Sequence, residues 1–364
     1  MALPLHTPFS PMEAQSVDTI PLGKEWHYEP KWDGFRTLVF RDGDMVDLQS
    51  KSGRPMTRYF PEVVEAMRAL AATKFVLDGE LVVPHGNAFS FDALLQRIHP
   101  AASRVRKLAV ETPALLILFD VLVADDGHAV LDKPLSVRRA ALESFFRKYC
   151  RGADLVGLSP VTTRLAEAKG WLKRTGGMLD GIVAKRCDLP YRSGARDGMQ
   201  KIKNYRSADC VVGGFRYNQG STLVGSLLLG LYGSDGLLHH VGFTSTIKRQ
   251  DKAALTKKLE ALVKPPGFTG NAPGGPSRWS TRRSDQWQPL EPKLVVEVGY
   301  DHFSGGRFRH GTRLLRWRPD KAPRQCTLNQ VRQKKTGLVA LLGRESISSL
   351  RRAIRAFTPV FDGL

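Results

Sequence analysis

The sequence predicts a protein of mixed helix and strand content, α/β or α+β, followed by a small antiparallel barrel. Three observations lead to this prediction. The chain has 364 residues, enough for two or three domains. Hydrophobic residues make up 42% and charged residues 25%, as in ordinary globular proteins, so a disordered chain or a fibre is excluded. Short β-like runs alternate with helical stretches over the first two hundred residues, and strands broken by glycine follow.

Three apolar runs in the first part predict interior strands: Phe75–Val83, Leu115–Val123 and Ile182–Ala184. Helices are expected between them. Pro61 stands at a favourable first helical position, and Ser136 is a suitable N-cap for a second helix. A third helix is expected over Thr163–Thr175, where Gly176 and Gly177 provide a stop signal.

Near Ser207 the sequence pattern changes to short strands interrupted by glycine, so we predict a domain boundary near residue 206. Three glycine-containing strands follow, with the sequences CVVGGFRY, LVGSLLLGLYG and LLHHVGFTST. A helical segment over Lys252–Val263 separates them from a second strand group, KLVVEVGY and RLLRWRP. The basic tail, 331–364, contains a short helical pattern at Ser346–Ala356.

The charge distribution indicates a polyanionic partner. The formal net charge is +20, with 27 Lys+Arg against 24 Asp+Glu in residues 1–200 and 28 against 11 in residues 201–364. Nucleic acid and an acidic membrane are the candidate partners. No apolar run reaches the roughly 18 residues of a spanning helix, and the N-terminal residues do not resemble a secretory signal. The four cysteines form no CxxC pair, which predicts reduced thiols in a cytoplasmic protein without a zinc site.

An ordered series of short motifs carries the chemistry. The first is Glu29-Pro30-Lys31-Trp32-Asp33-Gly34-Phe35-Arg36. Taken alone, a lysine beside Asp-Gly is more often a solvated charge at a strand-to-turn junction. Further motifs follow in the order Ser50–Arg54 (SKSGR), Leu77–Glu80 (LDGE), Leu118–Leu122 (LFDVL), Asp180–Lys185 (DGIVAK), Lys201–Lys203 (KIK) and Arg318–Lys321 (RPDK).

Together these motifs resemble the covalent nucleotidyltransferases, and in particular the ATP-dependent DNA ligases, over roughly Pro11–Thr327. The length is most similar to that of the short bacterial C-type ligases. The resemblance implies an α+β fold, with an N-terminal nucleotidyltransferase (adenylation) domain of antiparallel sheets and helices in 1–206. It also implies an OB-fold barrel in 207–330, followed by the basic tail. One strand carboxylate, usually Glu in this family, is Asp180 here.

The implied reaction seals nicks in duplex DNA through a lysyl-AMP and a DNA-adenylate. Lys31 is the expected nucleophile. A lysine amine, with a reference pKa of about 10.4, must be desolvated or placed near other cations to react at neutral pH. Such cations, which also balance charge on the α-phosphate, are expected from Arg36, Lys185, Lys201 and Lys203. Arg318 and Lys321 are expected to cover the ATP pyrophosphate during the first step.

The resemblance also implies how ATP is held. Phe119 is expected to stack on adenine, Glu29 to contact the adenine edge, and Lys185 to line the nucleotide site. The ribose and phosphates are assigned to Arg36, Arg54 and Glu80. Glu80 and Asp180 are hard oxygen ligands suited to Mg²⁺, with Mn²⁺ as a substitute. The structural alternatives are packing for Phe119 and Trp32, and turn formation for Asp33 and Asp78. A second interpretation of Asp33 and Asp78 is that their negative charge orients nearby lysines.

The expected partners are ATP and nicked double-stranded DNA, without a membrane. A cytoplasmic, nucleoid-associated monomer that serves DNA repair is expected. The surplus of Lys and Arg after residue 200 suits phosphate contacts that do not depend on base sequence. ATP is preferred to NAD because zinc-finger cysteines and further C-terminal modules are not seen. An RNA ligase, a capping-type guanylyltransferase and a catalytically inactive nucleic-acid-binding protein remain as alternatives.

Overall fold

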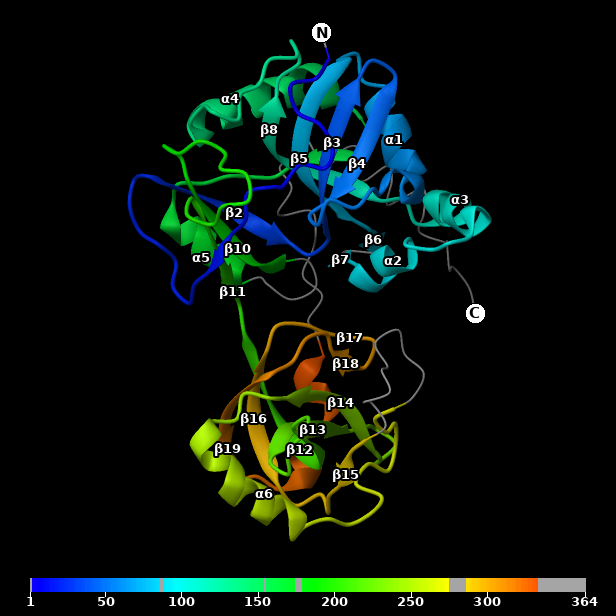
Figure 1. Ribbon diagram of the computed structural model, residues 1–364, viewed down its shortest axis with the longest axis vertical. Coiled ribbons are helices and arrows are strands. Elements are labelled where there is room, and N and C mark those ends of the chain that lie inside the picture. Colours follow the sequence, from blue (N-terminus) through cyan, green and yellow to red (C-terminus); the bar gives the residue numbers. More distant parts are fainter. Residues whose placement is uncertain (1, 86–87, 154, 174–178, 275–285, 333–364) are drawn as a thin grey trace, which may run out of the picture. The chain divides into compact units, whose positions relative to one another are not determined.

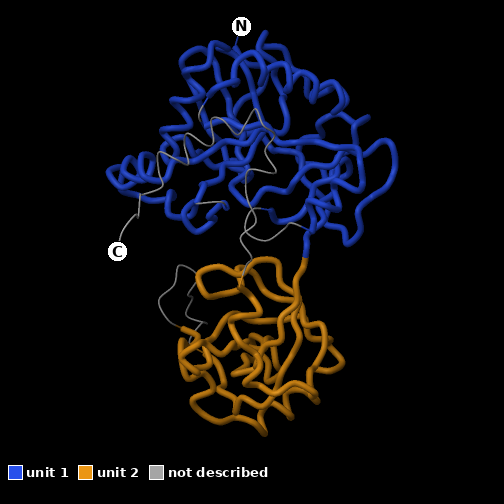
Figure 2. Tube along the Cα trace, turned by 180° about the vertical axis from the view of Figure 1, so that it is seen from behind, with its two compact units in different colours: residues 1–204, 334–364 blue, residues 205–333 orange. Residues whose placement is uncertain are grey.

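The computed structural model describes residues 2–85, 88–153, 155–173, 179–274 and 286–332. The chain divides into two compact units, one containing Met1–Asn204 and the other Tyr205–Gln333 (Figure 2). The expected helix stop at Gly176 and Gly177 and the expected tail helix at Ser346–Ala356 lie outside the described residues.

Two β-sheets form the framework of the first unit (Figure 1). The four-stranded sheet has the order β1 (Gln15–Ser16), β11 (Met199–Lys203), β10 (Leu179–Arg186), β2 (Trp26–Trp32). The five-stranded sheet has the order β4 (Met45–Ser50), β3 (Phe35–Asp42), β5 (Lys74–Val82), β8 (Leu115–Val123), β9 (Val156–Leu158). Two short strands, β6 (Pro84–His85) and β7 (Ala88–Phe89), form a separate pair. All pairs are antiparallel except β1 with β11 and β8 with β9, so the expected α+β class is confirmed.

The helices of this unit are α1 (Pro61–Arg68), α2 (Phe91–Gln96), α3 (Ala102–Glu111), α4 (Leu135–Phe145) and α5 (Leu165–Lys173), with a 3₁₀ turn at Thr57–Tyr59 and a π-helical turn at Phe146–Cys150. Helix α1 begins at Pro61, as predicted. The predicted N-cap at Ser136 is wrong, because Pro134 takes the N-cap position and no side chain caps the helix. Proline fixes its own φ, which suits this entry into a helix.

In the four-stranded sheet, successive side chains along each strand point to opposite faces, as the two-residue period of a strand requires. Tyr28, Ile182, Ala184 and Ile202 are buried in one hydrophobic cluster, which also contains Trp171 of α5. The intervening residues of the same strands therefore face away from this core. That second face carries the charged residues described below.

The second unit is an antiparallel barrel. Strands β12 (Arg206–Tyr217), β13 (Val224–Tyr232) and β14 (Leu238–Thr244) form a meander, and α6 (Lys252–Glu260) follows a 3₁₀ turn at Arg249–Asp251. Strand β16 (Val295–Tyr300) returns to pair with β12 on its other side, and β19 (Arg313–Trp317) pairs with β16. Short strands β15 (Gln288–Pro289), β17 (Phe303–Ser304) and β18 (Arg307–Phe308) and 3₁₀ turns at Pro323–Gln325 and Leu328–Val331 complete it.

A parallel bridge joins Thr244, at the end of the meander, to Thr312, the residue before β19. This connectivity is that of a five-stranded OB-fold barrel, as expected. The barrel has its own core, in which Phe215, Leu229 and Val296 are fully buried. Among the described residues, no helix is both long and apolar enough to cross a membrane.

Candidate active site

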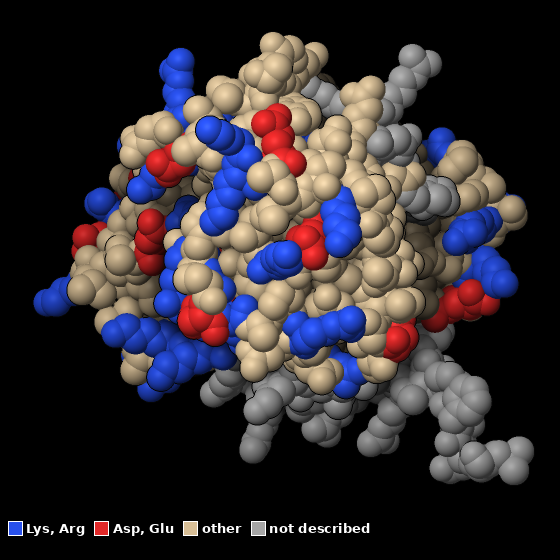
Figure 3. Space-filling model, turned by 90° about the horizontal axis from the view of Figure 1, so that it is seen from below, with Lys and Arg blue, Asp and Glu red and all other residues tan. Residues whose placement is uncertain are grey.

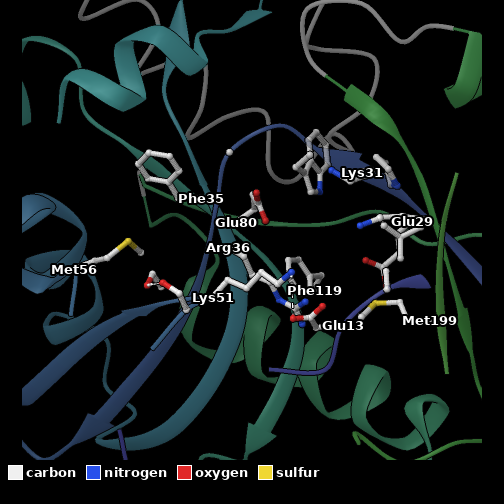
Figure 4. Close-up of a pocket in the computed structure, with 18 of the residues that line it drawn as sticks. Glu13, Glu29, Lys31, Phe35, Arg36, Lys51, Met56, Glu80, Phe119 and Met199 are labelled. Carbon is white, nitrogen blue, oxygen red and sulfur yellow. Dashed lines mark hydrogen bonds and ion pairs between the residues drawn. The ribbon is translucent and has the colours of Figure 1, made fainter. Parts of the chain in front are cut away.

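A pocket of about 1120 Å³ opens in the first unit and contains most of the residues expected to bind a nucleotide. Figure 4 shows Lys31, Glu80, Arg36 and Phe119 around this pocket, with Glu29 and Met199 on one side and Phe35 and Met56 on the other. Eight residues predicted from the sequence line it: Glu29, Lys31, Arg36, Arg54, Glu80, Phe119, Lys185 and Lys201.

The four-stranded sheet supplies one wall through its strand register. Val183 of β10 lies opposite Glu29 of β2 and opposite Lys201 of β11. Lys185 lies opposite Met199, and these five residues all line the pocket. They share one face because positions two apart on a strand point the same way, while the alternate positions fill the core. The pattern that buries the apolar residues thus also gathers the lysines.

Lys31 lies at the centre of a cluster of charged groups. Its Nζ atom contacts Oδ2 of Asp180, and the Nζ atom of Lys203 lies 3.5 Å from the same oxygen. The Lys31 side chain is 24% exposed, so it is shielded yet reachable from the pocket. Burial, and then the nearby Lys31 ammonium, lower the pKa of Lys201. Asp180 and Lys203 are therefore neighbours of the expected nucleophile, although they do not line the pocket themselves.

A β-bulge places Asp180. Leu179 pairs with Trp32 and Gly181 pairs with Lys31, so Asp180 is an extra residue in β10. Bulges of this kind redirect a side chain. Gly181 has a φ of 147°, and an added Cβ would lie 2.0 Å from the backbone oxygen of Ile202, so only glycine fits there. The glycine after Asp180 in the motif is thus explained by backbone geometry.

Trp32, the residue after Lys31, fixes the end of strand β2. Its indole Nε1 donates a hydrogen bond to Oγ of Ser159 at 3.1 Å, and the side chain is buried against Phe89. The packing interpretation of Trp32 is therefore confirmed. Asp33 lies in the short connection between β2 and β3, where the turn interpretation placed it.

Glu80 and Arg36 stand opposite each other on the five-stranded sheet. Burial raises the pKa of Glu80 to about 8, although the nearby Lys31 and Arg36 cations oppose the shift. An additional cation would stabilise the ionised form of such a buried carboxyl group. Mg²⁺ is commonly held by one or two carboxylates together with substrate phosphates. No group of three or more metal-ligating side chains occurs among the described residues. Glu80 and Asp180 each lie beside Lys31, and two carboxylates are a donor set suited to a metal that takes its remaining ligands from water and phosphate.

Phe119 lies at a second bulge. Asp120 pairs with Asp78 and Leu118 pairs with Gly79, so Phe119 is the extra residue of β8. It is half-buried and lines the pocket, whereas its neighbours in this strand are buried. Its ring is therefore not a simple core residue. The Lys185 Nζ atom lies 4.5 Å from the ring centroid and Cζ of Arg36 lies 5.5 Å from it.

Buried ion pairs hold the two cations beside Phe119. Lys185 pairs with Glu29 at 2.8 Å, and both side chains are buried. Arg36 donates hydrogen bonds to both oxygens of Asp78, at 3.1 and 2.7 Å, and to the backbone oxygen of Met12 at 2.6 Å. The Tyr191 hydroxyl donates to Asp78 at 2.7 Å.

The contacts of Asp78 with Arg36 and Tyr191 were not predicted from the sequence. Asp78 is fully buried inside strand β5, so its interpretation as a turn residue is wrong. The apolar run around Asp78 was the available signal, because a charged residue in an interior strand requires a partner. Tyr191, in the connection between β10 and β11, carried no such signal.

Arg318 and Lys321 belong to the second unit, after strand β19. The structure brings them together on one carboxylate, because both lie 2.9 Å from oxygens of Asp209 in β12. Arg318 also donates to Asp320, and these hydrogen bonds lower the pKa of Asp320 to about 2. Asp209 was not singled out from the sequence.

An N-terminal domain with a lysine-centred pocket and a C-terminal OB-fold barrel are the arrangement expected of the covalent nucleotidyltransferases. Comparisons with protein families agree with this class. Residues 11–203 match the family model of the ATP dependent DNA ligase domain, and residues 220–321 match that of the ATP dependent DNA ligase C terminal region. The chain belongs to the ATP-dependent DNA ligase family, as its motifs predicted.

Within this family the chain is similar to short bacterial ligases. It is 44% identical over 352 residues to DNA ligase C of Mycobacterium tuberculosis, covering 92% of this chain and 97% of that protein. It is also 44% identical to DNA ligase C2 of Mycolicibacterium smegmatis, covering 91% and 96% of the two chains. A solved structure of a Lig E DNA ligase is similar in fold, with a TM-score of 0.53 at 15% identity, covering 85% and 99% of the two chains.

Proposed function

We propose that this protein seals nicks in duplex DNA, joining a 3′-hydroxyl to a 5′-phosphate at the expense of ATP. The observation that carries the proposal is the position of Lys31. It lies in a nucleotide-sized pocket together with Glu29, Glu80, Phe119 and Lys185. A primary amine among cations and carboxylates is suited to attack an α-phosphate.

In the first step the Nζ atom of Lys31 releases a proton to water and forms a bond to the α-phosphorus of ATP. The bond from this phosphorus to the pyrophosphate breaks, and Lys31 carries AMP. Lys201 and Lys203 lie near Lys31 and supply positive charge where the α-phosphate must sit. Asp180 holds the Lys31 side chain in place before the attack.

The adenine is assigned to the wall formed by Phe119, Glu29 and Lys185. The half-buried Phe119 ring offers an apolar face inside a polar pocket, and stacking on such a face suits any base. Glu29 supplies a hydrogen-bond acceptor for the adenine amino group. Arg36 and Arg54, which line the same pocket, are assigned to the ribose and the phosphates.

Glu80 and Asp180 would hold Mg²⁺, or Mn²⁺ in its place. A bound divalent ion would neutralise phosphate oxygens during the transfer. The support for this assignment is the buried Glu80 carboxyl with its raised pKa and the cation-paired Asp180 near Lys31.

AMP then passes to the 5′-phosphate of the nick, and the 3′-hydroxyl displaces it. Both later steps require the protein to hold duplex DNA of any sequence. Lys and Arg are spread more widely than Asp and Glu on the face shown in Figure 3. Residues 201–364 contain 28 Lys+Arg against 11 Asp+Glu, which suits contacts with backbone phosphates. We assign the enzyme to DNA repair, as a cytoplasmic, nucleoid-associated monomer.

A labelling experiment tests the proposed function. The protein is incubated with Mg²⁺ and α-labelled ATP or GTP, and then with nicked DNA or nicked RNA duplexes. We expect label on the protein from ATP alone and sealing of nicked DNA. Label from GTP would favour a capping-type enzyme, and preferential sealing of RNA an RNA ligase. Binding of nicked DNA without any adduct would establish an inactive nucleic-acid-binding protein.

A further inference from the structure

Asp209 is a buried carboxylate in the barrel that links the two cations of the last motif. It lies in strand β12 and is 7% exposed. Its Oδ1 atom accepts a hydrogen bond from NH1 of Arg318 and its Oδ2 atom accepts one from Nζ of Lys321, both at 2.9 Å. The two oxygens of one carboxylate thus hold one cation each.

The carboxylate has little freedom to move. The Gln330 side-chain amide bonds to both backbone groups of Asp209, accepting from its N–H at 3.0 Å and donating to its C=O at 3.1 Å. Strand β16 pairs with this part of β12 on the other side, with Glu297 opposite Asp209. Main-chain pairing and a side-chain clamp together fix the position from which Arg318 and Lys321 are held.

Two cations that act on one pyrophosphate need a carboxylate between them, such as that of Asp209. Arginine and lysine have long side chains with high rotamer entropy, and their like charges repel at short range. A carboxylate between them removes the repulsion and restricts both side chains. Arginine has five N–H donors and lysine three. Arg318 uses one N–H on Asp209 and two on Asp320, and Lys321 uses one on Asp209, so both keep donors with which phosphate oxygens can be bound.

We propose that Asp209 is a positioning residue for the first step of the reaction. It holds Arg318 and Lys321 side by side, so that both can stabilise the leaving pyrophosphate when Lys31 attacks ATP. This inference rests on the proposed function. The later steps have no pyrophosphate, and the role of Asp209 therefore ends once AMP is on Lys31.

The test compares two reactions of the full-length protein. One is the single-turnover rate of adenylation at saturating ATP, and the other is the sealing of a nick that already carries AMP. We expect Asp209→Asn to slow adenylation about 10- to 100-fold, the range for misplaced catalytic groups, and to leave pre-adenylated sealing within about twofold. Asp209→Glu should recover part of the rate, because the charge is kept.

Glu291→Gln is the matched control, since Glu291 is a barrel carboxylate that also pairs with two cations, Lys264 and Lys293. It should change neither reaction. Thermal unfolding of each variant reports on folding. An unchanged or faster adenylation by Asp209→Asn would overturn the positioning role, because the carboxylate would then be inert or would restrain the cations. An equal loss in both reactions with a lower Tm would also overturn it, as a purely structural role.

Failure of the proposed function has a different signature. If the wild-type protein formed no AMP adduct, nick sealing itself would be rejected, whatever Asp209→Asn did. If the wild type formed the adduct and Asp209→Asn matched it, only the positioning role would be rejected.

Discussion

The Nζ atom of Lys31 contacts the Oδ2 atom of Asp180 across the adjacent strands β2 and β10. This ion pair joins the proposed nucleophile to a proposed metal ligand. Lys203 approaches the same carboxylate, so Asp180 balances two cations at once. The bulge at Asp180 is what brings the side chain to this place.

We expect Asp180→Asn to raise the Mg²⁺ concentration needed for nick sealing at least about tenfold, because a charged hard ligand is lost while side-chain volume is kept. Unfolding free energy should fall by only about 1–2 kcal/mol, since Lys31 and Lys203 are partly exposed and can be hydrated. Sealing rates across a Mg²⁺ series measure the first effect and denaturant unfolding the second.

Asp188→Asn is the control for this variant. Asp188 pairs with Arg186 at the surface, just after β10, and should leave the Mg²⁺ dependence unchanged. A wild-type Mg²⁺ dependence for Asp180→Asn would remove Asp180 from the metal site.

Replacing Phe119 by Leu should weaken ATP binding with little loss of stability. Base stacking on an aromatic ring contributes about 1–3 kcal/mol, so the Kd should rise roughly 5- to 150-fold. Equilibrium binding of a non-hydrolysable ATP analogue measures this change. Phe75→Leu is the control, because Phe75 is fully buried in the core of the same unit and should lower Tm without changing Kd. The reverse pattern would make Phe119 a packing residue only.

Replacing Arg318 and Lys321 together by Ala should abolish self-adenylation and sealing from ATP. A nick that already carries AMP should still be sealed at a substantial rate, because no pyrophosphate leaves in that reaction. Arg316→Ala removes a neighbouring cation, 64% exposed, and should leave both reactions nearly unchanged. Equal loss of the double variant on both substrates, at unchanged nick affinity, would assign these residues to the later steps.

Ending the chain at Tyr205 should leave a folded first unit that binds nicked DNA weakly. The hydrophobic clusters around Phe75, Trp171 and Tyr191 lie entirely before this point, whereas most of the net positive charge lies after it. Affinity of the full chain should fall steeply with salt, because phosphate contacts release counterions. Nick affinities of both proteins across a salt series check this. Equal affinities at moderate ionic strength would contradict the assignment of DNA binding to the barrel.

Much of the fold could be predicted because hydrophobic periodicity and turn residues are local signals. The runs that predicted strands became β5, β8 and part of β10, and the change of sequence pattern near Ser207 marks the barrel strands. Ser136 shows the limit of such signals, because a good capping residue lost its position to the preceding Pro134. The residue at which a helix begins depends on the backbone path of the chain into the helix, which composition alone does not determine.

The site was predicted as a set of residue types, but its supporting contacts were not. Lys31, Glu80 and Phe119 stand in motifs that the sequence displays in order. No sequence motif predicts the bulges or the long-range pairs. Asp209 contacts Lys321, 112 positions away, and Tyr191 contacts Asp78, 113 positions away. These contacts join a strand residue to a residue of a connecting segment, and the tertiary fold brings together residues that no local pattern connects.

The most direct test of the account is whether AMP becomes attached to Lys31. The wild-type protein and Lys31→Ala are each incubated with ATP and Mg²⁺, and their intact masses are measured. We predict that the wild type gains the mass of one AMP and that Lys31→Ala, still folded and still able to bind DNA, gains none, because the Nζ atom alone forms the bond to phosphorus. A Lys31→Ala protein that gained the mass of AMP would contradict the account.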